Sequence, residues 1–198
     1  MAVVTRKAEQ SEATQRALIK VARRLFAKNG YAATPIEDIV RSAQVTRGAL
    51  YHHFQGKQDL FRAVFEQMEA ELAQQVAAVA AEEQRPELHL ELGAQAMLDA
   101  CLHPAVQRIV LLDAPSVLGW QTWHEIEEKH GLGLLTVAIQ VAMESGRIEP
   151  APAGPLAQVI LGALIEAALA IARADDREAA RKEIGASVAR LIAGLKPR

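Results

Sequence analysis

The sequence is poor in cysteine, aromatic residues and strand-forming runs. Cys101 is its only cysteine, which excludes an intramolecular disulfide and a thiol-rich zinc site and fits a protein of the reducing cytoplasm. Aromatic residues make up 4% of the chain, whereas 51% of it is hydrophobic. This balance supplies a packed core and predicts an all-α fold, in one domain or in a small domain joined to a larger one.

Long apolar runs are also missing. Residues 1–10 carry charges and no apolar stretch, so we expect no secretory signal there. The most apolar segment, residues 156–172, is interrupted by Gln158 and Glu166 and is shorter than the roughly 20 residues that span a bilayer. We therefore expect no membrane association and interpret this segment as a buried interface helix.

Signatures of enzymes are scarce. The sequence has no Walker sequence, no glycine-rich nucleotide loop and no Ser/His/Asp order, so we expect no catalytic residues, no cofactor and no metal. Glu127 and His130 form one Glu-x-x-His pair of the kind found in di-iron helical bundles. Such centres need two pairs and further glutamates from facing helices, so a metal enzyme is the weaker alternative.

The net charge of −2 conceals a strong asymmetry. Residues 1–62 contain 11 Lys and Arg against 5 Asp and Glu, whereas residues 63–198 contain 11 against 19. A basic N-terminal part on an acidic body indicates that the N-terminal part meets a polyanion and the body does not.

Apolar periodicity, caps and breaks predict a series of helices. Gly30 is expected to end the first helix. Thr34 is expected to cap the second helix, with Pro35 as its first residue, and Thr46 to cap the third. The expected helices cover residues 11–29, 35–43, 47–53, 57–82, 87–102, 104–113, 119–145, 155–173 and 176–195.

Residues 36–54 form two short helices joined by a tight turn, with the first helix packed behind them, which is a helix-turn-helix. At 100° per residue, Arg47 and Tyr51 share one side of the third helix and Leu50 points the opposite way. A recognition helix presents its N-terminal residues to base edges in the major groove. The sequence therefore predicts DNA binding. An ordinary helical packing with a solvated basic face is the alternative.

The exposed side of this helix offers two kinds of contact. Arg47 can donate two hydrogen bonds to guanine O6 and N7. Gly48 allows close approach of the backbone, and the small Ala49 can touch a thymine methyl group. Tyr51 and His52 lie on the flank that faces phosphates, and both can donate a hydrogen bond.

Two further positions lie at helix N-termini, where backbone N–H groups and the helix dipole attract anions. We expect Thr34 and Lys57 to bind phosphates on either side of the recognition helix. Such contacts position a protein on DNA, while base contacts specify the sequence.

Several short motifs occur in a characteristic order and spacing: GYAAT at residues 30–34, IEDI at 36–39, VTRGALYHHF at 45–54, Lys57, and LF at 60–61. In this order they resemble the N-terminal domain of the tetracycline-repressor (TetR) family over about residues 14–64. The resemblance implies a helix-turn-helix DNA-binding domain at residues 1–56 and a helical effector-binding and dimerisation domain at residues 57–198. It also implies a repressor that a small molecule releases from a palindromic operator. The DNA-facing positions that it implies are Thr34, Thr46, Arg47, Gly48, Tyr51, His52 and Lys57.

The last two helices are the expected homodimer interface, over about residues 155–195. Residues 155–173 are apolar over most of their circumference, and a helix of this kind must be buried. A two-fold dimer places two recognition helices about one DNA turn apart, ~34–36 Å. A monomeric core helix is the alternative.

The middle helices are expected to hold the effector, an unidentified small molecule. Trp120 and Trp123 lie close enough along the chain to wall an apolar or aromatic ligand. The alternatives are that Met97, Met143 and one tryptophan belong to the core, and that Cys101 only packs rather than senses oxidants. A regulator that has lost ligand control is a further alternative. The candidate pocket residues are Met97, Cys101, His103, Gln107, Trp120, Trp123, His124, Gln140 and Met143.

Overall fold

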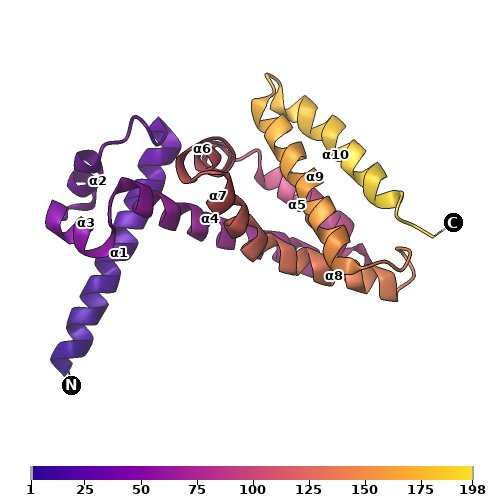
Figure 1. The fold of residues 1–198 in the computed structure, drawn as a ribbon, viewed down its shortest axis with the longest axis horizontal. Helices are drawn as coiled ribbons and strands as arrows, with labels where there is room; N and C mark the ends of the chain where they lie inside the picture. The colour runs from indigo at the N-terminus through magenta and orange to yellow at the C-terminus, as the bar shows by residue number, and fades with distance from the viewer. Residues whose placement is uncertain (1, 198) are drawn as a thin grey trace.

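The computed structural model describes residues 2–197, with side chains from residue 8 onward, and this part of the chain contains helices and no strands (Figure 1). The prediction of an all-α fold is confirmed. Three helices form the N-terminal unit: α1 (Ala2–Asn29), α2 (Ile36–Ala43) and α3 (Arg47–His53). The long α4 (Lys57–Ala81) leaves this unit and runs into the body of the molecule.

The body is built from helices of three hydrogen-bonding types. A 3-10 turn, η1 (Pro86–Leu88), precedes α5, and two π-helical segments, η2 and η3, interrupt the α-helices of the middle region. At the far end from the N-terminal unit, the last two helices pack antiparallel (Figure 1). The remaining elements are α5 (His89–Ala100), η2 (Val106–Asp113), α6 (Ala114–Leu118), α7 (Trp120–Glu127), η3 (Glu128–Leu132), α8 (Gly133–Glu144), α9 (Ala153–Arg173) and α10 (Arg177–Ala193).

The ends of the N-terminal helices follow the local chemistry, with two corrections. Gly30, at φ +80°, ends α1, and Thr46 caps α3, both as predicted. The expected start of α1 near residue 11 was wrong, because residues 2–10 contain no glycine or proline to stop the helix. The N-cap of α2 is Pro35 and not Thr34, whose side chain is buried beneath the turn.

The middle helices differ from the prediction where π-helical turns occur. A helix was expected to end near residues 113–115, yet it continues to Leu118 and ends at Gly119, which has φ +80°. Pro115 lies in the first turn of α6, directly after the π-helical segment η2. The helix expected over residues 119–145 is present as α7, η3 and α8 in succession.

One buried core joins the N-terminal unit to the body. Phe26, Leu50 and Phe61 are fully buried in the same cluster as Ile109 and Trp123 of the middle helices. The predicted domain boundary after residue 56 coincides with the loop before α4, but apolar packing continues across it. The N-terminal unit and the body are therefore in contact through contiguous buried side chains.

A second core cluster links α5, α8, α9 and α10. Among the described residues, α9 is the one helix long and apolar enough to cross a membrane, and 56% of its most apolar 18-residue window is buried. Leu164 and Ile171 of α9 pack against Leu98, Ile139 and Val188 in this cluster. The apolar composition of α9 is thus used for packing.

Candidate functional site

The recognition helix α3 is held by its cap and by one buried face. The Thr46 hydroxyl accepts a hydrogen bond from the backbone N–H of Ala49 at 3.1 Å. Leu50 is fully buried against α1 and α2, and Phe54 is buried at the end of the helix. Burying these two side chains leaves the opposite side of α3 in solvent.

The exposed side of α3 carries the predicted contacts. Arg47, Gly48, Tyr51 and His52 are exposed and Ala49 is half-buried. The guanidinium of Arg47 lies 5.6 Å from the ring centroid of Tyr51, and its Nη2 donates to the Tyr51 hydroxyl at 3.4 Å. The structure therefore brings together the positions that the sequence places on one side of the helix.

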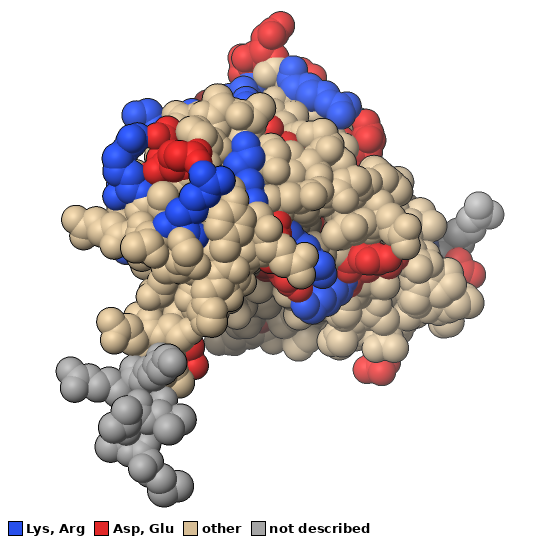
Figure 2. Space-filling model, turned by 60° about the vertical axis from the view of Figure 1, so that its left-hand side comes forward, with Lys and Arg blue, Asp and Glu red and all other residues tan. Residues whose placement is uncertain are grey.

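Acidic residues occupy the same surface as the basic ones. Glu37 of α2 accepts a hydrogen bond from Nη1 of Arg47 at 3.0 Å, and Asp38 pairs with Arg41. On the forward face in Figure 2, blue and red side chains accordingly lie next to one another. In this structure the exposed guanidinium of Arg47 is thus paired with Glu37 and bonded to Tyr51.

Two of the predicted phosphate contacts point inward. Thr34 is fully buried and its hydroxyl donates to the carbonyl of Gly30 at 2.7 Å, so this side chain cannot reach a phosphate, and the prediction for it is corrected to a structural role. The amino group of Lys57 donates to the carbonyl of Tyr31 at 2.9 Å and lies 4.1 Å from the centre of its ring. What remains at this position is the N-terminus of α4, where the N-cap Gly56 offers no side chain to cap the first N–H groups.

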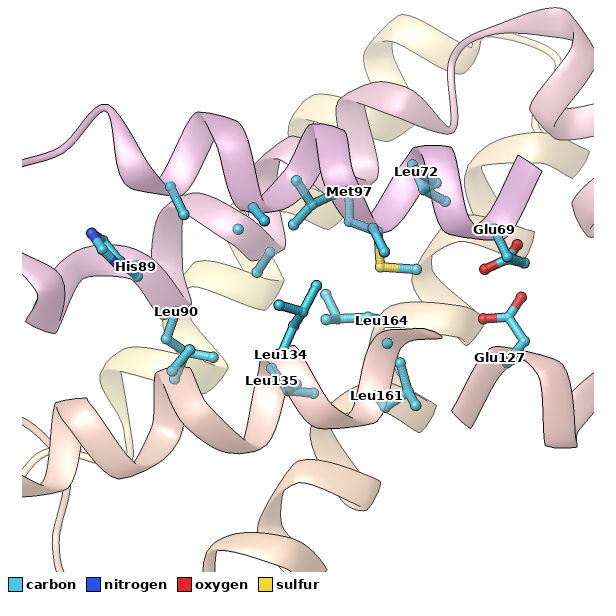
Figure 3. Close-up of a pocket in the computed structure, with 18 of the residues that line it drawn as sticks. Glu69, Leu72, His89, Leu90, Met97, Glu127, Leu134, Leu135, Leu161 and Leu164 are labelled. Carbon is cyan, nitrogen blue, oxygen red and sulfur yellow. The ribbon is translucent and has the colours of Figure 1, made fainter. Parts of the chain in front are cut away.

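The body contains an elongated cavity of about 240 Å³, bounded by α4, α5, α8 and α9 (Figure 3). Its wall is almost entirely aliphatic. Two carboxyl groups, from Glu69 and Glu127, face each other at one end, and His89 lies at the other. The lining includes Leu72, Val76, Leu90, Met97, Cys101, Val110, Leu111, Leu134, Leu135, Leu161, Leu164 and Ile165.

Of the nine candidate pocket residues, the structure places Met97 and Cys101 on the cavity wall. Gln107 and Trp123 are buried in the core instead. The other five lie outside the lining: His103, Trp120, His124, Gln140 and Met143.

The two tryptophans do meet, but away from the cavity. Their ring centroids are 4.9 Å apart, and Trp120 stacks on His124 at 5.6 Å with an interplanar angle of 13°. Trp120 is 64% exposed whereas Trp123 is fully buried, so this cluster extends from the surface into the core.

Glu69 and Glu127 were not among the predicted pocket residues. Glu69 lies among Phe65, Met68 and Leu72 on the apolar side of α4, and an acidic residue on such a stripe was the available signal. Glu127 was noted only as a partner for His130. The described residues contain no group of three or more His, Cys, Asp or Glu side chains that could hold a metal ion.

Burial dominates the electrostatics of this end of the cavity. Desolvation, reinforced by the charge of Glu127, raises the pKa of Glu69 well above its ordinary value. Desolvation also raises the pKa of Glu127 to about 7. Burial, with the two glutamates, raises the pKa of Cys101 to about 12, so its thiol stays protonated and is a poor oxidant sensor.

One segment touches both the cavity and the N-terminal unit. Val110 and Leu111 of η2 line the cavity, and Asp113 ends the same segment. Oδ2 of Asp113 accepts the backbone N–H of Tyr31 at 2.8 Å and lies 3.3 Å from Nε of Arg108. The loop before α2 is therefore fastened to the element that borders the cavity.

Comparison with known proteins gives matches over both parts of the chain. Residues 18–64 match the family model for bacterial regulatory proteins of the tetR family, and residues 88–195 match the model for a tetracyclin repressor-like C-terminal domain. Among solved structures, a TetR-family transcriptional regulator from Pectobacterium atrosepticum is 34% identical, with a TM-score of 0.85 over 96% of this chain and 98% of that chain.

Curated relatives match over a short part of the chain. The transcriptional regulator AcrR of Shigella flexneri is 38% identical over 66 residues, which are 33% of this chain and 31% of that protein. QacR of Staphylococcus aureus is 46% identical over 44 residues, 22% of this chain and 23% of that protein. The chain thus matches less than a third of the length of each of these two relatives.

Proposed function

Because the chain belongs to the tetR family of bacterial regulatory proteins, we propose that it is a homodimeric transcriptional repressor that a small molecule releases from a palindromic operator. The observation that carries this proposal is the exposed polar side of α3, capped by Thr46 and anchored by Leu50. The protein acts in the cytoplasm, where operator DNA lies, and binds rather than transforms its ligands.

The residues of α3 contact either bases or phosphates, depending on their position along the helix. Arg47, Gly48 and Ala49, at its N-terminal end, contact bases, with Arg47 leaving Glu37 for guanine O6 and N7. Tyr51 and His52 contact the phosphate backbone together with Thr46.

At the start of α4, the uncapped N–H groups beside Lys57 bind a further phosphate, which the helix dipole favours. Lys57 itself contributes by holding Tyr31 in place through the hydrogen bond to its carbonyl.

Apolar residues exposed on α9 and α10 favour dimerisation through these helices. Val159 of α9 is 69% exposed and Leu191 of α10 is 51% exposed, although both side chains are apolar. At Gly162, an added Cβ would meet nothing within 4 Å, which leaves room for a second helix to approach. A two-fold dimer through this face carries two copies of α3 and matches a palindrome.

The cavity supplies the effector site, and η2 supplies its connection to DNA binding. A ligand in the cavity contacts Val110 and Leu111 and so favours one position of η2, which Asp113 transmits to the loop at Tyr31. The ligand releases DNA to the extent that it binds one of the two conformations more tightly.

The test begins with selection of operator sequences from a random DNA pool by the full chain. Arg47→Ala should relax base preference at one position per half-site, by ~1–3 kcal/mol for a bidentate contact. Tyr51→Ala should reduce the slope of log affinity against log salt by about one unit for each phosphate that the variant no longer binds. Arg85→Ala is the matched control, since Arg85 is also exposed and paired with a glutamate but lies after α4. No selected sequence, or unchanged selectivity in Arg47→Ala, would refute the proposal.

A further inference from the structure

The polar end of the cavity contains a buried acid with no partner. Glu69 is 4% exposed, and its Oε1 makes no hydrogen bond to any described residue. Glu127 is 5% exposed and faces Glu69 across the cavity (Figure 3). Buried carboxyl groups in proteins are normally paired with a cation or hydrogen-bonded. The acids at this end of the cavity therefore call for a partner that donates hydrogen bonds or carries positive charge.

Within the described part of the chain, no basic side chain forms an ion pair with Glu69 or Glu127. The positive charge of Arg181 of α10 acts on the neighbouring Cys101. Its guanidinium is already bound, through a hydrogen bond of 2.8 Å to Asp99 and one of 3.0 Å to the carbonyl of Gln95. The Cys101 thiol is neutral, so it does not balance the acids.

The residues that line the cavity determine which kind of ligand can bind at its polar end. Two facing carboxyl groups offer acceptors and negative charge, and both repel an anion. Burial and the charge of Glu127 raise the pKa of Glu69, as expected for two facing acids, so one carboxyl group ionises before the other. The remaining length of the cavity is aliphatic as far as His89, whose ring nitrogen is occupied by the carbonyl of Glu83 at 3.0 Å.

We propose that the cavity binds a lipophilic amine carrying one positive charge, with its ammonium group between Glu69 and Glu127 and its apolar body along α4, α5 and α8. The inference rests on the proposed function in one respect, namely that the occupant of this cavity is the effector. The ammonium N–H groups satisfy the unpartnered carboxyl oxygens, and the hydrocarbon body fills the aliphatic part.

The experiment compares three probes of equal length that differ in charge: 4-phenylbutylamine, 4-phenylbutan-1-ol and 4-phenylbutyrate. Binding to the full chain without DNA is measured by calorimetry at pH 7. The amine should bind about tenfold to hundredfold more tightly than the alcohol, as expected for a charge-assisted hydrogen bond in a buried site. The butyrate should bind most weakly.

Isosteric variants locate the effect. Glu69→Gln and Glu127→Gln should each weaken amine binding about tenfold or more and leave alcohol binding within about twofold. Glu125→Gln is the control, because Glu125 lies on the same helix as Glu127 but is exposed and bonded to Gln121. Thermal unfolding should show both cavity variants folded and at least as stable as the wild type, since each removes a buried like charge.

Equal affinity for amine and alcohol, preference for the butyrate, or amine binding unchanged in both cavity variants would each overturn the proposal. Operator release is assayed separately. If another compound releases operator DNA while the amine shows no preference, the cation site is refuted and the repressor function stands. If the amine preference is found and no operator is, the cation site stands and the repressor function is refuted.

Discussion

Asp113 fastens the effector-binding body to the DNA-binding unit, and replacing it with alanine should loosen that attachment. Its carboxylate accepts the N–H of Tyr31 at 2.8 Å and pairs with Arg108 at 3.3 Å. The Asp113 side chain is only 16% exposed, so water does not readily replace it. The loop at Tyr31 has no other side-chain acceptor for this N–H among the described residues.

The two contacts of Asp113 differ in expected strength. A hydrogen bond to a charged acceptor contributes ~1.5–3 kcal/mol, and an unsatisfied buried donor costs a similar amount. The pair with Arg108 contributes at most ~1 kcal/mol, because Arg108 is 45% exposed and solvent screens the interaction. Asp113→Ala should therefore lower the free energy of unfolding by about 2–3 kcal/mol, mainly through the N–H of Tyr31.

Urea unfolding measures the global loss, and amide hydrogen exchange localises it. A loss of about 2 kcal/mol corresponds to about thirtyfold faster exchange at the Tyr31 amide. Asp113→Asn keeps an acceptor oxygen and should lose less, and Arg108→Ala should lose less than about 1 kcal/mol. Unchanged protection of the Tyr31 amide in Asp113→Ala, or an equally large effect of Arg108→Ala, would refute this account.

Three further changes test the core, the acid pair and the dimer face. Leu50→Ala should cost about 2–5 kcal/mol of stability in urea and abolish operator binding, because a fully buried side chain anchors α3. Burial raises the folded-state pKa of Glu127 from 4.5 to about 7, so the stability linked to its protonated form is complete below pH 4.5 and is lost as the pH rises toward 7. This loss is up to ~3 kcal/mol, and urea unfolding at pH 5 and pH 8 should show a smaller pH dependence in Glu127→Gln than in the wild type. Val159→Glu should shift the chain from dimer to monomer in sedimentation velocity and leave its helical circular dichroism unchanged, since Val159 is 69% exposed in the single chain. A dimer in that variant, or an unaltered pH profile in Glu127→Gln, would contradict the corresponding assignment.

The helix-turn-helix was predictable because its determinants are local. The spacing of Leu50 and Phe54 against Arg47 and Tyr51 assigns each side of a seven-residue helix to core or solvent. The Thr46 cap depends on a hydroxyl three residues before the amide of Ala49. Interactions over three or four residues depend little on the rest of the chain where the side chain stays exposed, as at Thr46, whereas burial of Thr34 removed the cap expected there.

Positions whose neighbours are distant in the sequence were harder to predict. Lys57 stands at a helix N-terminus, where an anion contact is a reasonable expectation, but its amino group reaches Tyr31, 26 residues earlier. The expected pocket also depended on proximity along the chain: Trp120 and Trp123 do meet, but one is exposed, the other is buried in the core, and neither lines the cavity.

The helical class, the basic N-terminal part and the polar side of α3 follow from the order of residues alone, because periodicity, caps and charge counts are properties of neighbouring residues. The place of the cavity and the groups at its end follow instead from how the helices pack. Glu69 and Glu127 are 58 positions apart, and whether two acids are solvated or buried face to face depends on the packing of α4 against α7. Burial therefore decides how these two acids behave. Desolvation raises the pKa of each carboxyl group, and Oε1 of Glu69 makes no hydrogen bond to any described residue.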